Sequence, residues 1–150
     1  MRAHTPSERD FDPYKGDLDA QCAWRNFGGL SLVEAIEKFR SHPEAHQEDF
    51  MHMGGKAFSY YFPVLDAFLR ETVDLREEDI DDRQSWIIPQ CIMHQFEGKN
   101  LPYVRSRKFE ALELCNFMLD NIETFEGDWD PPGEIKRKWE ELKSHLSKIH

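Results

Sequence analysis

The sequence predicts an all-α, single-domain fold, an irregular bundle of about five to seven helices. Apolar residues recur three and four positions apart in several segments, which Gly or Pro residues separate. No segment alternates polar with apolar, β-branched residues over the length of a strand. The chain has 150 residues. A chain of this length buries about two-thirds of its unfolded surface, so one core suffices without a disulfide or a metal.

Residues 1–20 are predicted to form a loose N-terminal arm, because they are rich in acidic residues, contain Pro6, Pro13 and Gly16, and show no helical period. Residues 21–150 would then form the helical domain. The chain becomes apolar from Ala20 to Phe27, which predicts a short helix that Gly28 and Gly29 end.

The clearest helix start is Ser31 with Glu34, a capping box in which each side chain binds a free amide of the first turn. Apolar residues at helical spacing continue this amphipathic helix to about residue 40. Pro43 suits the first turn of the next helix. We expect that helix to end before the glycine pair Gly54 and Gly55.

Residues 54–69 hold the densest aromatic cluster and are predicted to form the apolar centre of the bundle. Pro63 stands inside their helical pattern. Because proline removes a backbone donor and clashes with the preceding turn, the helix should bend there. A second proline-bent helix is expected from Trp86 to Phe96, with Pro89 after its first turn, and the two bent helices should pack together.

Two further helices are predicted in the C-terminal third. The first should begin near Val104 or Ser106 and continue to about Thr124, and its wide apolar stripe, which starts at Phe109, predicts a central, buried helix. The last helix should be buried along one side, formed by Ile135, Trp139, Leu142 and Leu146.

The chain has a net charge of -10, and the acidic excess is shared by both halves. Such a field repels polyanions, so nucleic acid is a poor candidate partner and a basic protein or a cationic ligand is a better one. The densest acidic run lacks the ligand spacing and central glycine of a helix-loop-helix calcium site. Its residues are the predicted partner-binding surface: Asp74, Glu77, Glu78, Asp79, Asp81 and Asp82.

Cysteine use and hydropathy predict a cytoplasmic protein. The three cysteines form no CxxC pair, which favours a reduced compartment, and the N-terminus has no apolar signal segment. The longest near-apolar run, Ala57–Leu69, is too short to cross a bilayer and contains Asp66. We therefore expect no membrane insertion, and no cofactor.

Three histidines offer an alternative, enzymatic function. His42 and His46 are four residues apart, which places both on one face of a helix, and His52 is nearby. Two imidazoles at this spacing suit a divalent metal, although the HExxH order is absent. Tyr60 and Tyr61 are candidate ligand-stacking residues. Because neighbouring helix positions point about 100° apart, one tyrosine should face the core and the other solvent.

Two other patterns predict structure rather than chemistry. Cys91 and His94 share a helix face, but the apolar residues around Cys91 indicate a buried thiol rather than a nucleophile. The glycine pairs at 28–29 and 54–55, the second followed by Lys56, are better explained as turns than as phosphate-binding loops. No strand or GxxxxGKS pattern accompanies them.

The segment AFSYYFPVLDAFL, between a short acidic helix and a charged connection, resembles uncharacterised bacterial all-helical families with a Tyr-Tyr-x-Pro core motif. The resemblance covers about residues 31–97. Some of those small acidic proteins are immunity-type partners of toxins, so the resemblance implies a helical binding protein. It implies no site residue, because those families have no established active site.

The leading hypothesis is therefore a non-enzymatic, cytoplasmic interaction protein of immunity or adaptor type, which binds a basic partner through the acidic run. The alternative is a metal-dependent or small-molecule-binding enzyme that uses His42, His46 and His52. The third hypothesis is a subunit of a homo-oligomer, which would expose an apolar patch on the order of several hundred square ångströms.

Overall fold

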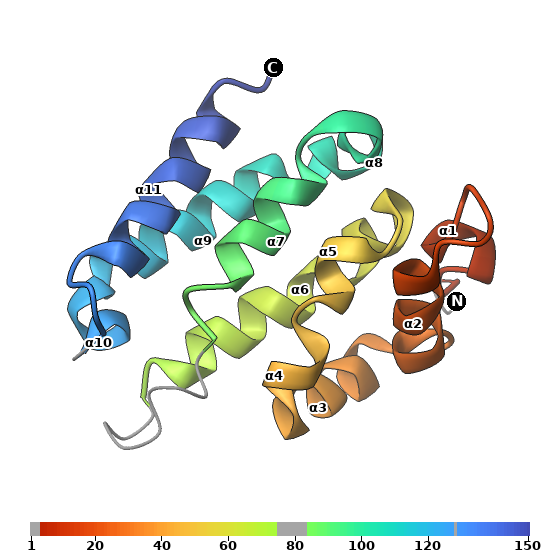
Figure 1. Cartoon of the computed structure of the whole chain (residues 1–150), viewed down its shortest axis with the longest axis horizontal. Coiled ribbons are helices and arrows are strands. Elements are labelled where there is room, and N and C mark those ends of the chain that lie inside the picture. Colours follow the sequence, from red (N-terminus) through yellow and green to blue (C-terminus); the bar gives the residue numbers. More distant parts are fainter. Residues whose placement is uncertain (1–3, 75–83, 128) are drawn as a thin grey trace.

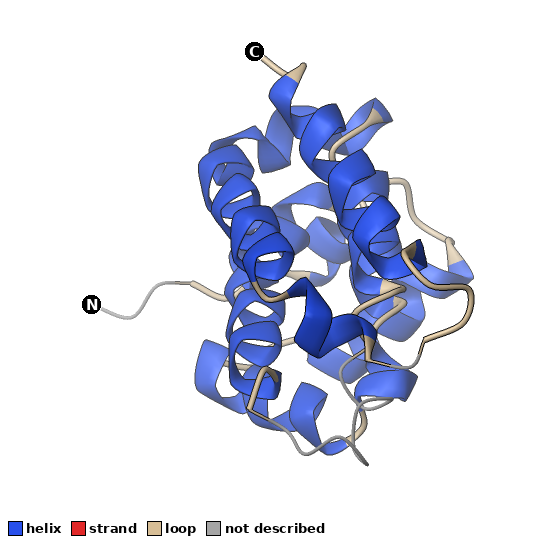
Figure 2. Cartoon of the chain, turned by 90° about the vertical axis from the view of Figure 1, so that its left-hand side faces the viewer, coloured by secondary structure: helices blue, strands red, loops and turns tan. Residues whose placement is uncertain are grey.

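The computed structural model describes residues 4–74, 84–127 and 129–150, and these residues form helices joined by short turns (Figures 1 and 2). The described part of the chain contains no strand, so the prediction of an all-α fold is confirmed. The predicted number of helices is too low, because short helices of four or five residues lie between the longer ones. None of the described helices is both long and apolar enough to cross a membrane.

The helices fall into two length classes. The longer ones are α2 (Leu18–Phe27), α3 (Leu32–Ser41), α6 (Gly55–Thr72), α7 (Ile88–Gln95), α9 (Lys108–Asp120) and α11 (Glu134–Ser147). The short ones are α1 (Glu8–Phe11), α4 (Pro43–His46), α5 (Asp49–His52), α8 (Leu101–Val104) and α10 (Ile122–Glu126), with the 3-10 turns η2 (Gly98–Asn100) and η3 (Arg105–Arg107). The capping box predicted at α3 is confirmed: Ser31 N–H donates to Glu34 Oε1 at 2.9 Å, and Glu34 N–H donates to Ser31 Oγ at 3.2 Å.

Helix α6 is the centre of the fold. It crosses the middle of the molecule, and α1, α3, α7 and α8 pack against it (Figure 1). Tyr61 and Phe62 are buried, and the Phe68 ring meets that of Phe39 from α3 edge to face, with 4.9 Å between centroids. α6 continues through Pro63 as one helix. A bend at Pro63 stays a prediction.

Pro89 occupies a different place from the one expected. α7 begins at Ile88, so Pro89 lies in its first turn rather than after it. Proline suits that position because the amides of the first turn have no acceptor within the helix. Pro89 therefore lies at the start of α7, as its second residue, rather than interrupting a longer helix.

Helices α7, α9 and α11 are the longer helices of the C-terminal half, and α11 packs against the other two (Figure 1). The Trp139 indole N–H donates to the Ser85 carbonyl oxygen at 2.8 Å, which joins α11 to the turn before α7. The one-sided stripe predicted for α11 is confirmed, because the structure buries Ile135, Trp139, Leu142 and Leu146.

The long helix predicted before α11 is divided into two. α9 ends at Asp120, where the Asn121 side-chain amide donates to the Phe117 carbonyl oxygen at 2.8 Å, and α10 follows. Phe109 was expected in the buried stripe, but it lies in the first turn of α9 and is 75% exposed. The stripe itself is buried further along, at Ala111, Leu114, Cys115 and Met118.

The N-terminal segment is anchored on the fold at Phe11 and Asp12, which are buried, in contrast to the loose arm expected over residues 1–20. Ser7 and Asp10 form a capping box at the start of α1. The Phe11 ring is fully buried, with its centroid 5.4 Å from that of Trp24 and 5.9 Å from that of Tyr61. The segment differs from the expectation because one aromatic side chain anchors it, and a single residue creates no periodic pattern.

The glycine pair at the start of α6 allows two segments to approach closely. The Gly54 N–H donates to the Phe11 carbonyl oxygen at 2.8 Å, and a Cβ at position 54 would lie 2.2 Å from the Asp10 carbonyl oxygen. The Gly55 N–H donates to Asn100 Oδ1 at 3.2 Å, and a Cβ there would lie 2.9 Å from the Asn100 carbonyl oxygen. Because the two glycines have no side chain, α1 and η2 can pack closely against the start of α6.

Candidate functional site

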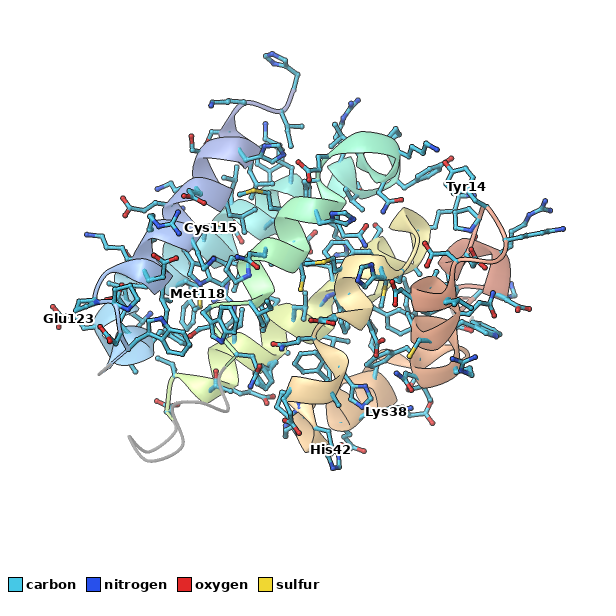
Figure 3. All side chains as sticks on the ribbon, viewed as in Figure 1. Tyr14, Lys38, His42, Cys115, Met118 and Glu123 are labelled. Atoms are coloured by element: carbon cyan, nitrogen blue, oxygen red, sulfur yellow. The ribbon has the colours of Figure 1, made fainter. Side chains whose placement is uncertain are left out.

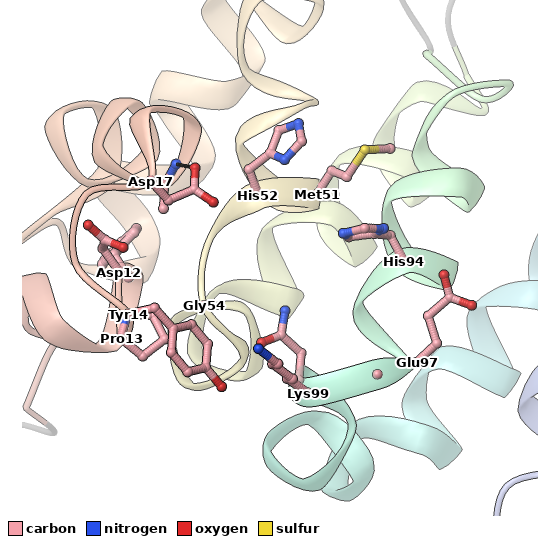
Figure 4. Close-up of a pocket in the computed structure, with 14 residues that line it drawn as sticks. Asp12, Pro13, Tyr14, Asp17, Met51, His52, Gly54, His94, Glu97 and Lys99 are labelled. Carbon is pink, nitrogen blue, oxygen red and sulfur yellow. Dashed lines mark hydrogen bonds between the residues drawn. The ribbon is translucent and has the colours of Figure 1, made fainter.

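A cleft of about 540 Å³ opens where the N-terminal segment meets α5 and the end of α7. Figure 4 shows Asp12, Tyr14 and Asp17 on one side of it, and His94 and Glu97 on the other. Its lining comes from three separate stretches of the chain: Phe11, Asp12, Pro13, Tyr14, Asp17, Ala20, Met51, His52, Gly54, His94, Glu97, Gly98, Lys99 and Asn100. Side chains of both charges therefore meet around one hollow.

The Asp12 carboxylate shapes the loop that forms one wall. Its Oδ2 accepts the Gly16 N–H at 2.8 Å and the Gln21 side-chain amide at 2.7 Å. The Gln21 hydrogen bond is the main cause that holds the pKa of Asp12 below its usual value. Lys15 and Gly16 have φ values of 56° and 97°, in the left-handed region that favours glycine. The buried carboxylate thus stabilises a tight turn that presents Tyr14 at the cleft.

Gln95 joins the elements beneath the cleft. Its side chain is fully buried, and Nε2 lies 3.0 Å from the Phe50 carbonyl oxygen and 2.7 Å from that of Met53. Its Oε1 accepts the Asn100 side-chain amide at 2.9 Å. One amide thereby links α5, α7 and η2, so the two helices that carry the histidines of the cleft are held together.

The two histidines of the cleft come from α5 and α7. The rings of His52 and His94 have centroids 6.3 Å apart; His52 is half-buried and His94 is exposed. Glu97 is exposed at the same end of α7. Across the cleft, Asp17 Oδ1 accepts two backbone N–H groups of α2, at 2.9 and 3.1 Å, so this helix cap uses one of the two carboxylate oxygens.

Lys99 contributes positive charge at the rim of the cleft. Its Nζ lies 4.6 Å from the centroid of the Tyr14 ring, within the range of a cation–π contact, and Tyr14 is 67% exposed. The carboxylates of Asp12, Asp17 and Glu97 line the same cleft. The lining therefore holds three carboxylates and one ammonium group.

Tyr61, predicted as a ligand contact, is part of the core. Its hydroxyl lies 2.7 Å from the Leu30 carbonyl oxygen and 2.9 Å from that of Phe27. Burial raises the pKa of Tyr61. Tyr60 is half-buried, and its ring meets that of Tyr61 edge to face at 4.8 Å. The expectation that one tyrosine faces the core is confirmed, and a ligand contact of Tyr60 stays a prediction.

The three histidines predicted as a metal site lie in different settings. His42 is exposed at the end of α3, well apart from Tyr14 at the cleft (Figure 3). His46 is half-buried, with Nδ1 3.3 Å from Asp49 Oδ2, and His52 lines the cleft. In the part of the chain that the structure describes, no three or more His, Cys, Asp or Glu side chains are arranged to hold a metal ion.

The predicted acidic surface is described at one position, Asp74, which is exposed beyond the end of α6. The other predicted residues of this surface lie outside the described residues: Glu77, Glu78, Asp79, Asp81 and Asp82. Binding through the acidic run therefore stays a prediction.

The thiols of Cys91 and Cys115 are buried. Burial raises the pKa of each to about 12, so very little of the nucleophilic thiolate is present at neutral pH. Both cysteines are core residues, as expected from their apolar neighbours.

Most of the cleft carries no recognisable sequence motif. Asp12 and Asp17 fall in the segment expected to be loose, and Glu97 and Lys99 belong to no pattern of site residues. A local signal was present: Asp12 and Asp17 flank a turn that contains Pro and Gly, and Asp17 precedes an apolar helical segment as an N-cap.

Comparison with models of protein families, with curated proteins and with solved structures finds no match to this chain. The resemblance to the Tyr-Tyr-x-Pro families stays an expectation.

Proposed function

We propose that this chain is a non-enzymatic interaction protein of adaptor or immunity type, and that its cleft receives a cationic side chain of a basic partner. The observation that carries the proposal is the convergence of three carboxylates, those of Asp12, Asp17 and Glu97, around one hollow. A lysine ammonium or an arginine guanidinium is the side-chain group that complements such a hollow.

The charges inside the cleft support a cationic ligand. The Asp12 carboxylate is ionised at neutral pH, and its lowered pKa keeps it ionised to a lower pH than an ordinary aspartate. Lys99, within the described residues, makes its close contact with the Tyr14 ring and not with a carboxylate, so Asp17 and Glu97 are left to bind a ligand. The net charge of -10 also attracts a basic partner over a longer range.

Asp17→Asn with Glu97→Gln tests the proposal. Asparagine caps a helix as well as aspartate does, so the first change removes charge from the cleft while it keeps the start of α2. The probe is a capped peptide of serine and glycine with one lysine, and NMR titration measures its affinity. Since a charge-assisted hydrogen bond contributes about 1.5 to 3 kcal/mol, we expect the double variant to bind about tenfold more weakly or worse.

Glu123→Gln provides the control, because Glu123 is exposed on α10 at the opposite end of the molecule from Tyr14 (Figure 3). We expect this variant to bind the lysine peptide as the unchanged protein does. Equal affinity of the cleft variant and the control would overturn the proposal.

The acidic run after α6 is compared with the cleft in the same assay. Charge reversal to lysine at Glu77, Glu78 and Asp79 tests the surface predicted from the sequence. If the charge-reversal variant loses binding and the cleft variant does not, partner binding is assigned to the acidic run rather than to the cleft.

A small-molecule function at the same cleft is the second candidate. It is favoured by the placement of His52 opposite His94, because imidazoles both bind ligands and transfer protons near neutral pH. A thermal-shift screen of metabolites, repeated on His52→Gln with His94→Gln, tests it. A compound that stabilises the unchanged protein but not this variant would support a small-molecule function, and a screen without such a compound would remove it.

A further inference from the structure

A second hollow of about 260 Å³ adjoins the cleft. The two share Pro13, Tyr14 and Asn100 in their linings, so they are neighbours with a common wall that includes Tyr14. The second hollow lies beside the start of α6, and its far side is formed by Arg9, Lys56 and Tyr103.

The charge of this second hollow is opposite to that of the cleft. Arg9 and Lys56 are exposed, and neither forms an ion pair within the ranges that the structure describes. The Lys56 Nζ lies 5.5 Å from the centroid of the Tyr103 ring, a cation–π contact that leaves its N–H donors available. The acidic residue of the hollow, Asp10, already accepts the Ser7 N–H at 2.9 Å in the capping box of α1.

We infer that the second hollow is an oxyanion subsite, which binds a carboxylate or phosphate group of the same partner segment whose cation occupies the cleft. The inference rests on the proposed function. Guanidinium and ammonium groups are the usual side-chain partners of carboxylate and phosphate oxygens, and they bind most strongly when no internal partner has to be displaced. The two neighbouring hollows together would therefore select a segment in which a cation is followed or preceded by an anion.

The two exposed tyrosines fit this role. Tyr14 is 67% exposed between the two hollows, and Tyr103 is 49% exposed at the second. Tyrosine offers a large, stiff surface at low entropic cost and is enriched among the residues that dominate binding energy. The Lys99 ammonium lies over the Tyr14 ring and the Lys56 ammonium lies over the Tyr103 ring. These cation–π contacts favour the placement of both positive charges beside the two hollows.

Capped peptides with a serine–glycine spacer of one to four residues test the subsite. One set pairs lysine with glutamate, a second pairs lysine with phosphoserine, a third pairs lysine with alanine, and a fourth pairs alanine with glutamate. NMR titration measures each affinity. We expect the best lysine–glutamate or lysine–phosphoserine peptide to bind about tenfold more tightly than its lysine–alanine counterpart, which corresponds to about 1.4 kcal/mol. A larger gain from phosphoserine assigns the subsite to phosphate, and an equal or larger gain from glutamate assigns it to carboxylate.

Arg9→Gln with Lys56→Gln is the diagnostic variant. This variant should bind the lysine–glutamate and lysine–phosphoserine peptides no more tightly than the lysine–alanine peptide. Its affinity for the lysine–alanine peptide should equal that of the unchanged protein. Lys136→Gln is the matched control, because Lys136 is an exposed cation on α11. That variant should keep the full gain.

The outcomes separate this inference from the proposed function. If the lysine–alanine peptide binds the cleft but the anionic residue adds nothing, or adds as much in the diagnostic variant, the subsite is overturned and the proposed function stands. If the alanine–glutamate peptide alone binds, and the diagnostic variant loses it, the subsite is supported and the proposed function fails. If no peptide binds, both are overturned.

Discussion

Gln95 and Asp49 are two of the buried polar side chains that join the short helix α5 to its neighbours. Gln95 reaches the carbonyl groups of Phe50 and Met53, as described above. Asp49 accepts the Asn26 side-chain amide from α2 at 2.9 Å. Because a buried polar group costs free energy unless its hydrogen bonds are made, these contacts favour one placement of α5, and with it one wall of the cleft.

Gln95→Met should destabilise the protein by about 2 to 3 kcal/mol, since the change keeps most of the volume but leaves buried carbonyl groups without their donor. Gln90→Met is the matched control, because Gln90 is exposed on the same helix. Urea unfolding measures both. Equal unfolding free energies for the two variants would contradict the role given to Gln95.

The Asp49 carboxyl should make stability depend on pH. Burial raises its pKa in the folded protein, against smaller lowering contributions from the Asn26 amide and His46. A carboxyl whose pKa rises on folding holds its proton more tightly when folded. Its stabilising contribution is therefore complete below the usual value of 3.8 and is lost as pH rises through the folded pKa.

Asp49→Asn removes this titration. We expect the stability of the unchanged protein, relative to this variant, to fall as pH rises above 3.8 and then to level off once Asp49 has ionised. Urea unfolding at a series of pH values measures the difference, with the exposed neighbour Glu48→Gln as control. A difference that is constant or rises with pH would rule out the raised pKa.

At the scale of the helices, α1 is the element that turns the N-terminal segment into a wall of the cleft. It is only four residues long, and its packing depends on the buried Phe11 and on the close approach that Gly54 permits. A helix this short is not stable alone, so tertiary contacts hold it in place. The loop that presents Tyr14 follows directly.

Phe11→Ala should cost about 3 to 5 kcal/mol of unfolding free energy, the usual range when a buried aromatic ring is removed and leaves a cavity. Phe109→Ala makes the same chemical change at a side chain that is 75% exposed, and should cost far less. Guanidinium unfolding of both variants measures the contrast. A loose N-terminal arm would make the two costs equal.

At the scale of the whole molecule, the net negative charge affects how fast the chain associates with a charged partner. The net charge is -10, and salt at 0.1 M screens exposed charges beyond about 10 Å. A basic partner should therefore associate faster at low ionic strength, whereas an uncharged one should show no such effect.

Affinity for the lysine peptide should fall as salt rises from about 0.05 to 0.5 M, because the interaction is between charges. The variant that combines Asp17→Asn with Glu97→Gln should show a shallower dependence, since it has lost two of the charges involved. NMR titration at several salt concentrations measures both slopes. Parallel slopes would show that the cleft carboxylates do not hold the cation.

Local patterns in the sequence were sufficient for the start of α3 and for the buried side of α11. The Ser31–Glu34 capping box and the α11 stripe that includes Trp139 act over three or four residues, so their effect is visible in the spacing alone. The same patterns do not reveal that Asn121 divides α9 from α10, or that Pro89 lies in the first turn of α7. The end of α9 depends on the Asn121 side chain reaching the Phe117 carbonyl oxygen, whereas no side chain caps the start of α7.

The cleft depended on the tertiary structure. Asp12, His52 and Glu97 are far apart in the chain, and they meet because Phe11, Gly54 and Gln95 bring their segments together. Similarly, periodicity shows that Tyr60 and Tyr61 face different directions, but only packing against Phe27 and Leu30 decides which one is buried. Spacing along the chain predicts which faces of a helix are apolar; contacts between distant segments decide which polar groups share a hollow.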